Sequence, residues 1–300
     1  RCQRPSIKRG RWTSCMINNI LEFEPVIRLG FFFGVFAVVA LWETATPRRP
    51  RSLGRWQRWP SNLGIVVLNT VLMRVMFPVA AVAMAVNVSA SGWGIFNMIE
   101  LPLWVEVIGA VALLDAAIYL QHVMFHAVPA LWRLHRMHHA DMDYDVTTGA
   151  RFHPIEIVLS MVIKLAVVTV LGASPVAVII FEVLLNATAM FNHGNIRLNL
   201  ALDGILRLFV VTPDMHRVHH SVIPSEANSN FGFNMPWWDR LFGTYKAQPA
   251  AGHDDMTIGI NVFREPEDQR LDKMLMQPFR DGAHGYVINA ARGDQQKTDT

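Results

Sequence analysis

Eight of the twelve histidines in this chain lie in three short clusters. Neutral imidazole is the commonest metal ligand near pH 7, and residues at i, i+3 and i+4 share one face of a helix. Three such faces turned toward one another could hold two metal ions. The clusters are one H-x-x-x-H and two H-x-x-H-H motifs, formed by His122 and His126, by His135, His138 and His139, and by His216, His219 and His220.

The isolated histidines, the two cysteines and the search for common enzyme motifs do not indicate a second site. Isolated histidines are usually surface or core residues, so we expect His253 and His284 to lie outside any metal site. Cys2 and Cys15 are remote from the histidines, which excludes a thiolate zinc ribbon. The H-x-x-x-H motif lacks the glutamate of a zincin protease, and no G-x-G-x-x-G or Walker A motif indicates a nucleotide site.

Long apolar stretches predict the elements that must position the histidines. Membrane spans are expected at about 25–43, 63–88 and 101–121. Residues 155–171 and 175–191 predict a helical hairpin, because a Gly- and Pro-containing turn separates them. A buried soluble core is the alternative, which so many uncharged helical runs disfavour. The expected fold class is therefore all-α: a multi-pass integral membrane bundle of three spans plus a hairpin, with a cytoplasmic histidine-rich cap.

Positive charge predicts the orientation of this bundle. Residues 48–58 contain five arginines, whereas the connections at 87–100 and 172–175 contain no Lys or Arg. The positive-inside rule places the arginine-rich connection in the cytoplasm and the other two outside. Counting crossings then puts all three histidine clusters on the cytoplasmic side. Because the basic residues flank apolar segments, they indicate membrane topology, and we expect no nucleic-acid partner.

Four segments around the clusters resemble the fatty acid hydroxylase and sterol desaturase superfamily, whose members are membrane enzymes with a histidine-bound di-iron centre. The resemblance implies two iron ions, which zinc can replace in nitrogen sites. It also implies O2-dependent hydroxylation or desaturation of a C–H bond in a fatty acyl or sterol-like lipid. The segments are 115–126 (DAAIYLQHVMFH), 134–154 (LHRMHHADMDYDVTTGARFHP), 191–195 (FNHGN) and 214–245 (DMHRVHHSVIPSEANSNFGFNMPWWDRLFGTY).

Two further histidines complete the expected set of ten ligands. His193 follows the returning arm of the hairpin, and His153 precedes the outgoing arm, so both should lie at the depth of the clusters. The fatty-acid 2-hydroxylase branch has H-x-x-x-H where this chain has Ala189 and His193, so only His193 matches. The F-H-P-x-E segment around His153 looks more like the sterol-desaturase branch.

Five residues are expected around the ligands or along a substrate tunnel. Asp115 and Tyr119 share a helical stripe with the first cluster, so Asp115 could orient a ligand histidine or make a packing hydrogen bond. Asp141 could orient a histidine or belong to a solvated loop. Asn192 adjoins His193. Asp239 lies in the family-like W-W-D-R-L-F-G-T-Y block and could pair with a basic group or form a structural turn.

The resemblance also suggests domain boundaries and partners. We expect an N-terminal arm at 1–24, of which 1–15 could be non-native because Met16 is a more natural start, and a transmembrane region at 25–99. A fatty acid hydroxylase-like catalytic domain should follow at 100–246, and then a polar C-terminal tail at 247–300. Without an H-P-G-G haem signature, electrons should come from a separate ferredoxin- or cytochrome b5-like donor.

Two other functions remain open from the sequence. Another membrane di-iron activity, such as ether-lipid cleavage or carotenoid hydroxylation, would need the same ligands. A histidine-rich metal transporter or metal-binding membrane protein belongs to a different class. A transporter should place its ligands near the membrane midplane at broken helices. The predicted ligands lie instead at helix ends, which disfavours transport.

Overall fold

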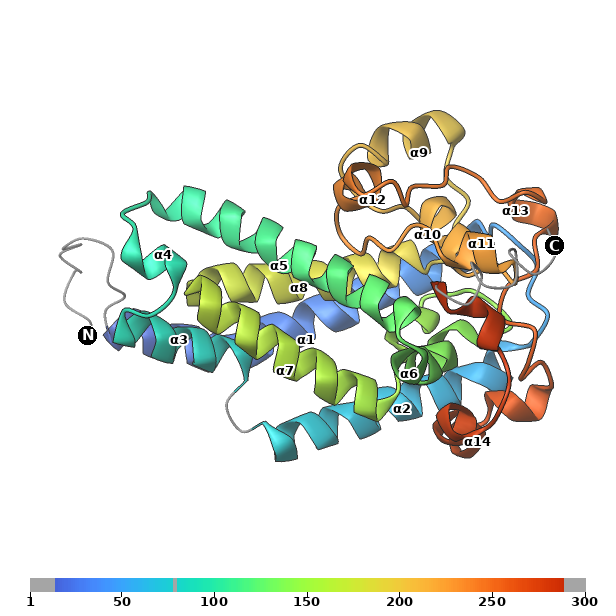
Figure 1. Cartoon of the computed structure of the whole chain (residues 1–300), viewed down its shortest axis with the longest axis horizontal. Helices are drawn as coiled ribbons and strands as arrows, with labels where there is room; N and C mark the ends of the chain where they lie inside the picture. Colours follow the sequence, from blue (N-terminus) through green and yellow to red (C-terminus); the bar gives the residue numbers. More distant parts are fainter. Residues whose placement is uncertain (1–13, 78–79, 289–300) are drawn as a thin grey trace, which may run out of the picture.

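The computed structural model describes residues 14–77 and 80–288, and all regular elements in this part of the chain are helices. Figure 1 shows the long helices running lengthwise beside one another, with most of the short helices gathered at one end. We call this end the cap. The long helices are α1 (Ser14–Ala45), α2 (Arg55–Met76), α3 (Ala81–Ser91), α5 (Leu103–Ala127), α7 (Pro154–Leu171) and α8 (Pro175–Asn192).

The short helices follow and connect the long ones. Helix α4 (Ile95–Met98) lies at the end of the bundle opposite the cap. The others are α6 (Pro129–His139), α9 (Leu200–Leu206), α10 (Pro213–His219), α11 (Pro224–Ala227), α12 (Trp237–Leu241), α13 (Gly252–Asp255) and α14 (Leu271–Met276), with 3-10 turns at Thr148–Ala150, Pro266–Gln269, Gln277–Phe279 and His284–Tyr286.

Several helices are long and apolar enough to cross a membrane, which confirms the expected helical membrane fold at this level. Helix α8 is central, because it packs against α1, α3 and α5. Large apolar side chains on α1 point outward, including Phe33 and Leu41, as expected for a surface in contact with lipid. The candidate stretches are Glu22–Ala45, Arg55–Met98, Leu103–Ala127, Pro154–Leu171 and Pro175–Asn192.

The second expected span, at 63–88, is not one helix. Helix α2 begins at Arg55 and ends at Met76, and α3 begins at Ala81. The sequence has a proline at 78, and helices usually end at or before the residue that precedes a proline. The earlier start of α2 takes Arg58, expected in a connection, into the helix and buries it completely.

The predicted hairpin is present, and its turn lies at the end of the bundle away from the cap. Helix α7 ends at Leu171 and is capped by Gly172, whose positive φ of 66° is the left-handed conformation that glycine adopts most easily. A Cβ added at Gly172 would lie 2.6 Å from the backbone oxygen of Trp93. The two connections expected on the same side of the membrane are therefore in direct contact.

The expected loose C-terminal tail is ordered as far as the structure describes it. Tyr286 is buried and stacks on Trp132 with ring centroids 5.6 Å apart. The indole Nε1 of Trp132 donates a hydrogen bond to the backbone oxygen of Ala283 at 3.0 Å. Aromatic stacking therefore fixes this segment against α6. The N-terminal extension expected at 1–15 falls almost entirely outside the described residues.

A charged cluster that the hydropathy pattern did not indicate lies inside the bundle. Glu182 of α8 is buried and pairs with Lys164 of α7 at 2.9 Å and with Arg28 of α1 at 3.2 Å. Charges at membrane depth are stable only when they are paired. This cluster therefore joins three helices of the bundle at a fixed register.

Candidate metal centre

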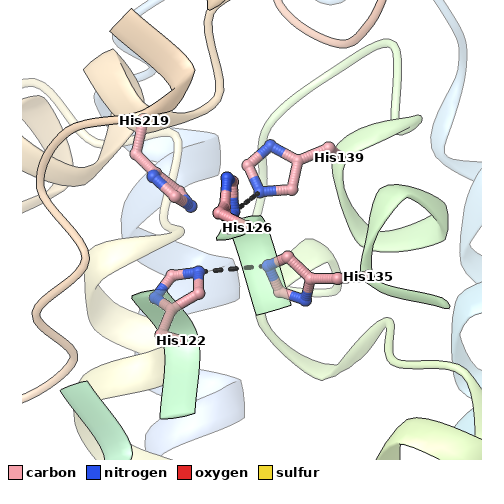
Figure 2. Close-up of side chains that lie close together, drawn as sticks. All are labelled: His122, His126, His135, His139 and His219. Atoms are coloured by element: carbon pink, nitrogen blue, oxygen red, sulfur yellow. Dashed lines mark hydrogen bonds between the residues drawn. The ribbon is translucent and has the colours of Figure 1, made fainter. Parts of the chain in front are cut away.

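Nine buried histidines lie at the cap end of the bundle in two adjacent groups. Within each group the possible ligand nitrogens all lie within 4.8 Å of one another, and no carboxylate or thiolate of the described residues belongs to either group. The first group contains five residues, shown in Figure 2, whose rings converge on a common centre. The first group is His122, His126, His135, His139 and His219, and the second is His138, His193, His216 and His220.

Four helices bring these rings together. Helix α5 carries His122 and His126 one turn apart at its cap end, and α6 turns back against α5 with the first H-x-x-H-H motif. His193 is the residue at which α8 ends. Helix α10 carries the second H-x-x-H-H motif and packs on α8. The eight clustered histidines and His193 thus meet at one end of the bundle, as the sequence predicts.

Hydrogen-bond accounting in the first group indicates that a cation belongs between the rings. The Nδ1 of His122 lies 2.7 Å from the backbone oxygen of Phe231, and the Nδ1 of His135 lies 2.7 Å from a carboxylate oxygen of Glu156. A carbonyl oxygen cannot donate, and an ionised Glu156 cannot donate either, so with Glu156 ionised each Nδ1 carries the proton and each Nε2 of a neutral ring keeps a lone pair. Those two Nε2 atoms face each other at 3.0 Å (Figure 2). Two lone pairs repel, whereas a metal ion could accept both.

The second group also brings its ring nitrogens close together. The Nδ1 of His193 lies 2.7 Å from the backbone oxygen of Ala189, so its Nε2 carries a lone pair. That Nε2 lies 3.2 Å from the Nε2 atoms of both His138 and His220. Among the residues that the structure describes, the Nδ1 atoms of His138 and His220 have no hydrogen-bond partner, so their tautomers are not fixed. A nitrogen-only set of neutral donors fits iron, zinc or copper.

Burial keeps the cap histidines neutral at physiological pH. Desolvation lowers the pKa of His135 to about 3. Desolvation, reinforced by neighbouring histidines, also lowers the pKa of His138, His139, His219 and His220 well below the usual range. Neutral imidazole is the form that binds metal. The neutral rings are therefore available as metal ligands without prior loss of a proton.

His153 is the one expected ligand that the structure does not bring to either group. Its Nδ1 accepts a hydrogen bond from the backbone nitrogen of Ile155 at 3.2 Å and caps α7. Its Nε2 lies 3.3 Å from the backbone oxygen of Leu275. Both ring nitrogens are thus engaged with the backbone, and the structure groups the other nine of the ten expected ligands.

Glu156 is a residue of the site that the sequence analysis missed. It is buried, and its contact with His135 makes it the one carboxylate that contacts a grouped histidine among the described residues. The other Nδ1 atoms for which the structure shows a partner face amide or backbone oxygens of Phe231, Asn228, Ala189 and Ser229. The F-H-P-x-E spacing, three residues after His153, was the available signal.

We expect the Glu156→Gln protein to bind metal about 10–100-fold more weakly, as is typical when the carboxylate partner of a ligand histidine is removed. Glutamine keeps the size of the side chain but not the negative charge that favours the Nδ1–H tautomer. The measurement is metal retention during titration with a chelator. Glu106→Gln is the matched control, because Glu106 binds the backbone nitrogen of Ser174 in another part of the bundle. Equal retention by both proteins would remove Glu156 from the site.

The side chains of three other expected neighbours make hydrogen bonds to residues other than the grouped histidines. One carboxylate oxygen of Asp115 accepts hydrogen bonds from Trp238 Nε1 at 2.8 Å and from the backbone of Met235 at 3.2 Å, and so contacts no ligand histidine. Tyr119 and Thr244 share a hydrogen bond of 2.8 Å. The amide of Asn192 donates to the backbone oxygen of Phe233.

Asp239 holds the loop whose carbonyl fixes His122. Its carboxylate accepts hydrogen bonds from the backbone nitrogens of Phe231 and Gly232 at 2.8 and 2.9 Å and from the Thr244 hydroxyl at 2.7 Å. Burial nevertheless raises the pKa of Asp239 above its ordinary value. A position for Asp239 in a structural turn, one of the two alternatives open from the sequence, is therefore the one observed.

Asp141 belongs to a buried ion-pair network beneath the second group. Both of its carboxylate oxygens accept hydrogen bonds of 2.7 Å from Arg58 of α2, and Asp145 accepts a third from the same guanidinium. Although burial works to raise it, Arg58 and Arg151 lower the pKa of Asp141 to about 2. The network fixes the loop that follows the first H-x-x-H-H motif to α2.

The fold and the site together define a helical membrane protein with a histidine-rich candidate metal centre. Residues 107–244 match the family described as fatty acid hydroxylase. The ornithine lipid hydroxylase OlsE of Rhizobium tropici is 27% identical over 259 residues, which cover 83% of this chain and 74% of that protein. No solved structure matches the chain.

Alkylglycerol monooxygenases match a shorter region. The Xenopus tropicalis protein is 31% identical over 191 residues, which cover 61% of this chain and 40% of the relative. The human protein is 30% identical over 156 residues and 32% of its length. The chain thus spans less than half of these relatives. Over residues 107–244 the chain is thus similar to the fatty acid hydroxylase family, and the relatives that it resembles are lipid hydroxylases and monooxygenases, which supports an oxidoreductase.

Proposed function

We propose that this protein is an O2-dependent lipid hydroxylase in which the nine grouped histidines hold two iron ions. The observation that carries the proposal is the pair of adjacent, buried, all-histidine groups, in which ring nitrogens face one another at 3.0 Å (His122 and His135) and 3.2 Å (His138 and His193). Bound iron would supply the reduction of O2 and the oxidation of a C–H bond. Metal analysis of the purified protein should find two metal ions per chain with nitrogen ligands alone, and a single ion or a carboxylate-rich shell would contradict the assignment.

The overall reaction sets what the protein must provide. A C–H bond, one O2, two electrons and two protons yield a C–OH group and water. The histidine groups are buried, so the cap excludes bulk water from the reacting carbon. We propose that the electrons come from a separate protein donor. We also propose that the cap faces the cytoplasm, because the arginine-rich segment at 48–58 lies on that side of the bundle.

A membrane lipid is the substrate class that the relatives favour. OlsE is named for hydroxylation of ornithine lipid, and it is similar to most of this chain. Ether-lipid cleavage is the second candidate, because alkylglycerol monooxygenases match over 61% of this chain. We expect the acyl or alkyl chain of the lipid to reach the metals from the bilayer.

Untargeted lipid analysis tests the proposal and separates the two candidates. The chain and its His138→Ala form are produced in the same host under isotopically labelled O2. We expect a lipid that gains one labelled oxygen atom with the unchanged chain and not with the variant. Loss of an ether lipid with release of an aldehyde would favour the second candidate. Identical lipid profiles from the two hosts, with metal-loaded protein present, would count against both.

A further inference from the structure

An exposed apolar surface covers one side of the cap. Leu200 of α9 and Leu241 of α12 are 76% and 69% exposed, and Phe209 between them in sequence is 64% exposed. Contiguous apolar surfaces of this kind mark sites of interaction with a partner or a membrane. We call it the α9–α12 surface, and its residues are Leu200, Leu202, Ile205, Leu208, Phe209, Trp237, Leu241 and Phe242.

Helix α9 buries its polar residues and exposes its apolar residues, which is the reverse of a helix on a water-exposed surface. Its polar residues Asp203 and Arg207 point inward, where they are buried and form an ion pair of 2.6 Å. Its apolar residues point outward. A helix in contact with water normally turns its polar face to the solvent. The surroundings of α9 are therefore apolar.

The α9–α12 surface is fixed to the side of α5. Trp238 of α12 donates a hydrogen bond to Asp115 of α5, and the Phe242 ring stacks on Tyr119 with centroids 5.4 Å apart. Trp237 in turn donates to the backbone oxygen of Leu208 at 2.6 Å, which joins the segment after α9 to α12. Figure 1 shows α9 and α12 together on one side of the cap.

The anchoring residues of α5 lie well inside a candidate membrane span. Helix α5 ends at Ala127, so Tyr119 lies about 12 Å and Asp115 about 18 Å before its end, at about 1.5 Å per residue. A bilayer that surrounds α5 must therefore reach the side chains of α12. The α9–α12 surface is thus continuous with the lipid-facing surface of α5, where Leu113 and Leu120 are 45% and 55% exposed.

We infer that the α9–α12 surface is inserted into the lipid bilayer, in the leaflet on the side of the metal centre. Its apolar residues would lie at the boundary of headgroups and acyl chains, and the exposed Arg240 beside them would meet lipid phosphates. The inference rests on the bundle crossing the membrane and not on the reaction proposed above. It places bilayer lipid next to α5 within one turn of His122.

Site-specific fluorescence quenching tests this insertion without any assay of activity. A parent chain with Cys2→Ser and Cys15→Ser is labelled at Ile205→Cys, Phe209→Cys or Leu241→Cys and reconstituted in vesicles of phosphatidylcholine and phosphatidylglycerol. We expect strong quenching by lipids that carry a nitroxide on the upper acyl chain, about 5–10 Å below the headgroup boundary, and little quenching by aqueous iodide. Three labelling positions are used so that the test does not depend on one substitution that prevents folding.

Asp255→Cys is the matched control, because Asp255 is exposed on α13 at the far end of the cap. Its label should respond to iodide and not to the lipid-borne quencher. Labels at 205, 209 and 241 that respond like the label at 255 would overturn the inference. Labels shielded from both quenchers would also overturn it, because a second copy of the chain or another protein would then cover the surface.

Discussion

The His138→Ala protein is expected to retain at most one metal ion per chain and to lose its activity. His138 faces His193 across 3.2 Å between their Nε2 atoms, and it stacks on Phe152, whose phenyl ring cannot replace a missing ligand. We expect turnover to fall by more than about 100-fold, since loss of even an outer partner of a ligand costs 10–100-fold. Metal analysis and lipid turnover on the same preparation measure both effects.

His153→Ala is the matched control for this experiment. His138 of α6 stacks on Phe152, the residue before His153, so the two histidines lie in the same region. Only His138 belongs to a metal group. The control should keep two metal ions and near-normal turnover, and should lose about 1 kcal/mol of stability with its helix cap. If His153→Ala loses metal and His138→Ala does not, the grouping of ligands proposed here is wrong.

The Arg58→Met protein is expected to be less stable by about 3–5 kcal/mol, the usual cost of removing one partner from a buried ion pair. Arg58, Asp141 and Asp145 are all fully buried. Methionine fills a similar volume but leaves Asp145 without its ion pair and leaves Asp141 with only the weaker contact to Arg151 at 3.7 Å. Thermal unfolding in detergent measures the loss, and metal content shows whether the loop that follows the first H-x-x-H-H motif still holds its ligands.

Two further proteins make this result specific. Arg51→Met, in the same basic segment, should unfold like the unchanged chain because Arg51 is exposed. The double variant Arg58→Met, Asp145→Asn should recover part of the lost stability, because it removes the carboxylate left without a partner and keeps Asp141 opposite Arg151. Equal stability of the Arg58→Met and Arg51→Met proteins would show that the network does not hold the cap.

The histidine groups could be predicted because helical periodicity is local. Residues three or four apart share a face wherever the helix lies, so the clusters indicated a common site before any packing was known. Contacts made by residues distant in the chain could not be predicted in this way. The position of the His153 ring depends on its contact with the carbonyl of Leu275. The contact between Glu156 and His135 depends on the packing of α7 against α6.

Charged residues show a second limit of sequence interpretation. Arg58 was counted only as a positive charge on one side of the membrane, and it proves to be the centre of a buried network. The sequence left Asp141 between an orienting role and a solvated loop, and the structure shows a third position. Lys164 and Glu182 each stand as an isolated charge in an apolar stretch, which is itself a signal of a paired partner.

The order of the C-terminal segment limits how this enzyme could be divided or combined with others. Residues 107–244 match the family, but residues outside this range also support the site. The ring of Trp132 lies 4.8 Å from that of His126 and is covered by Tyr286. Arg58 binds Asp141 in the loop that follows the first H-x-x-H-H motif. A fragment cut at the limits of the match would expose the imidazoles to water and remove a counter-charge. A chimera that exchanges this catalytic region between relatives must therefore carry the flanking segments of the same parent.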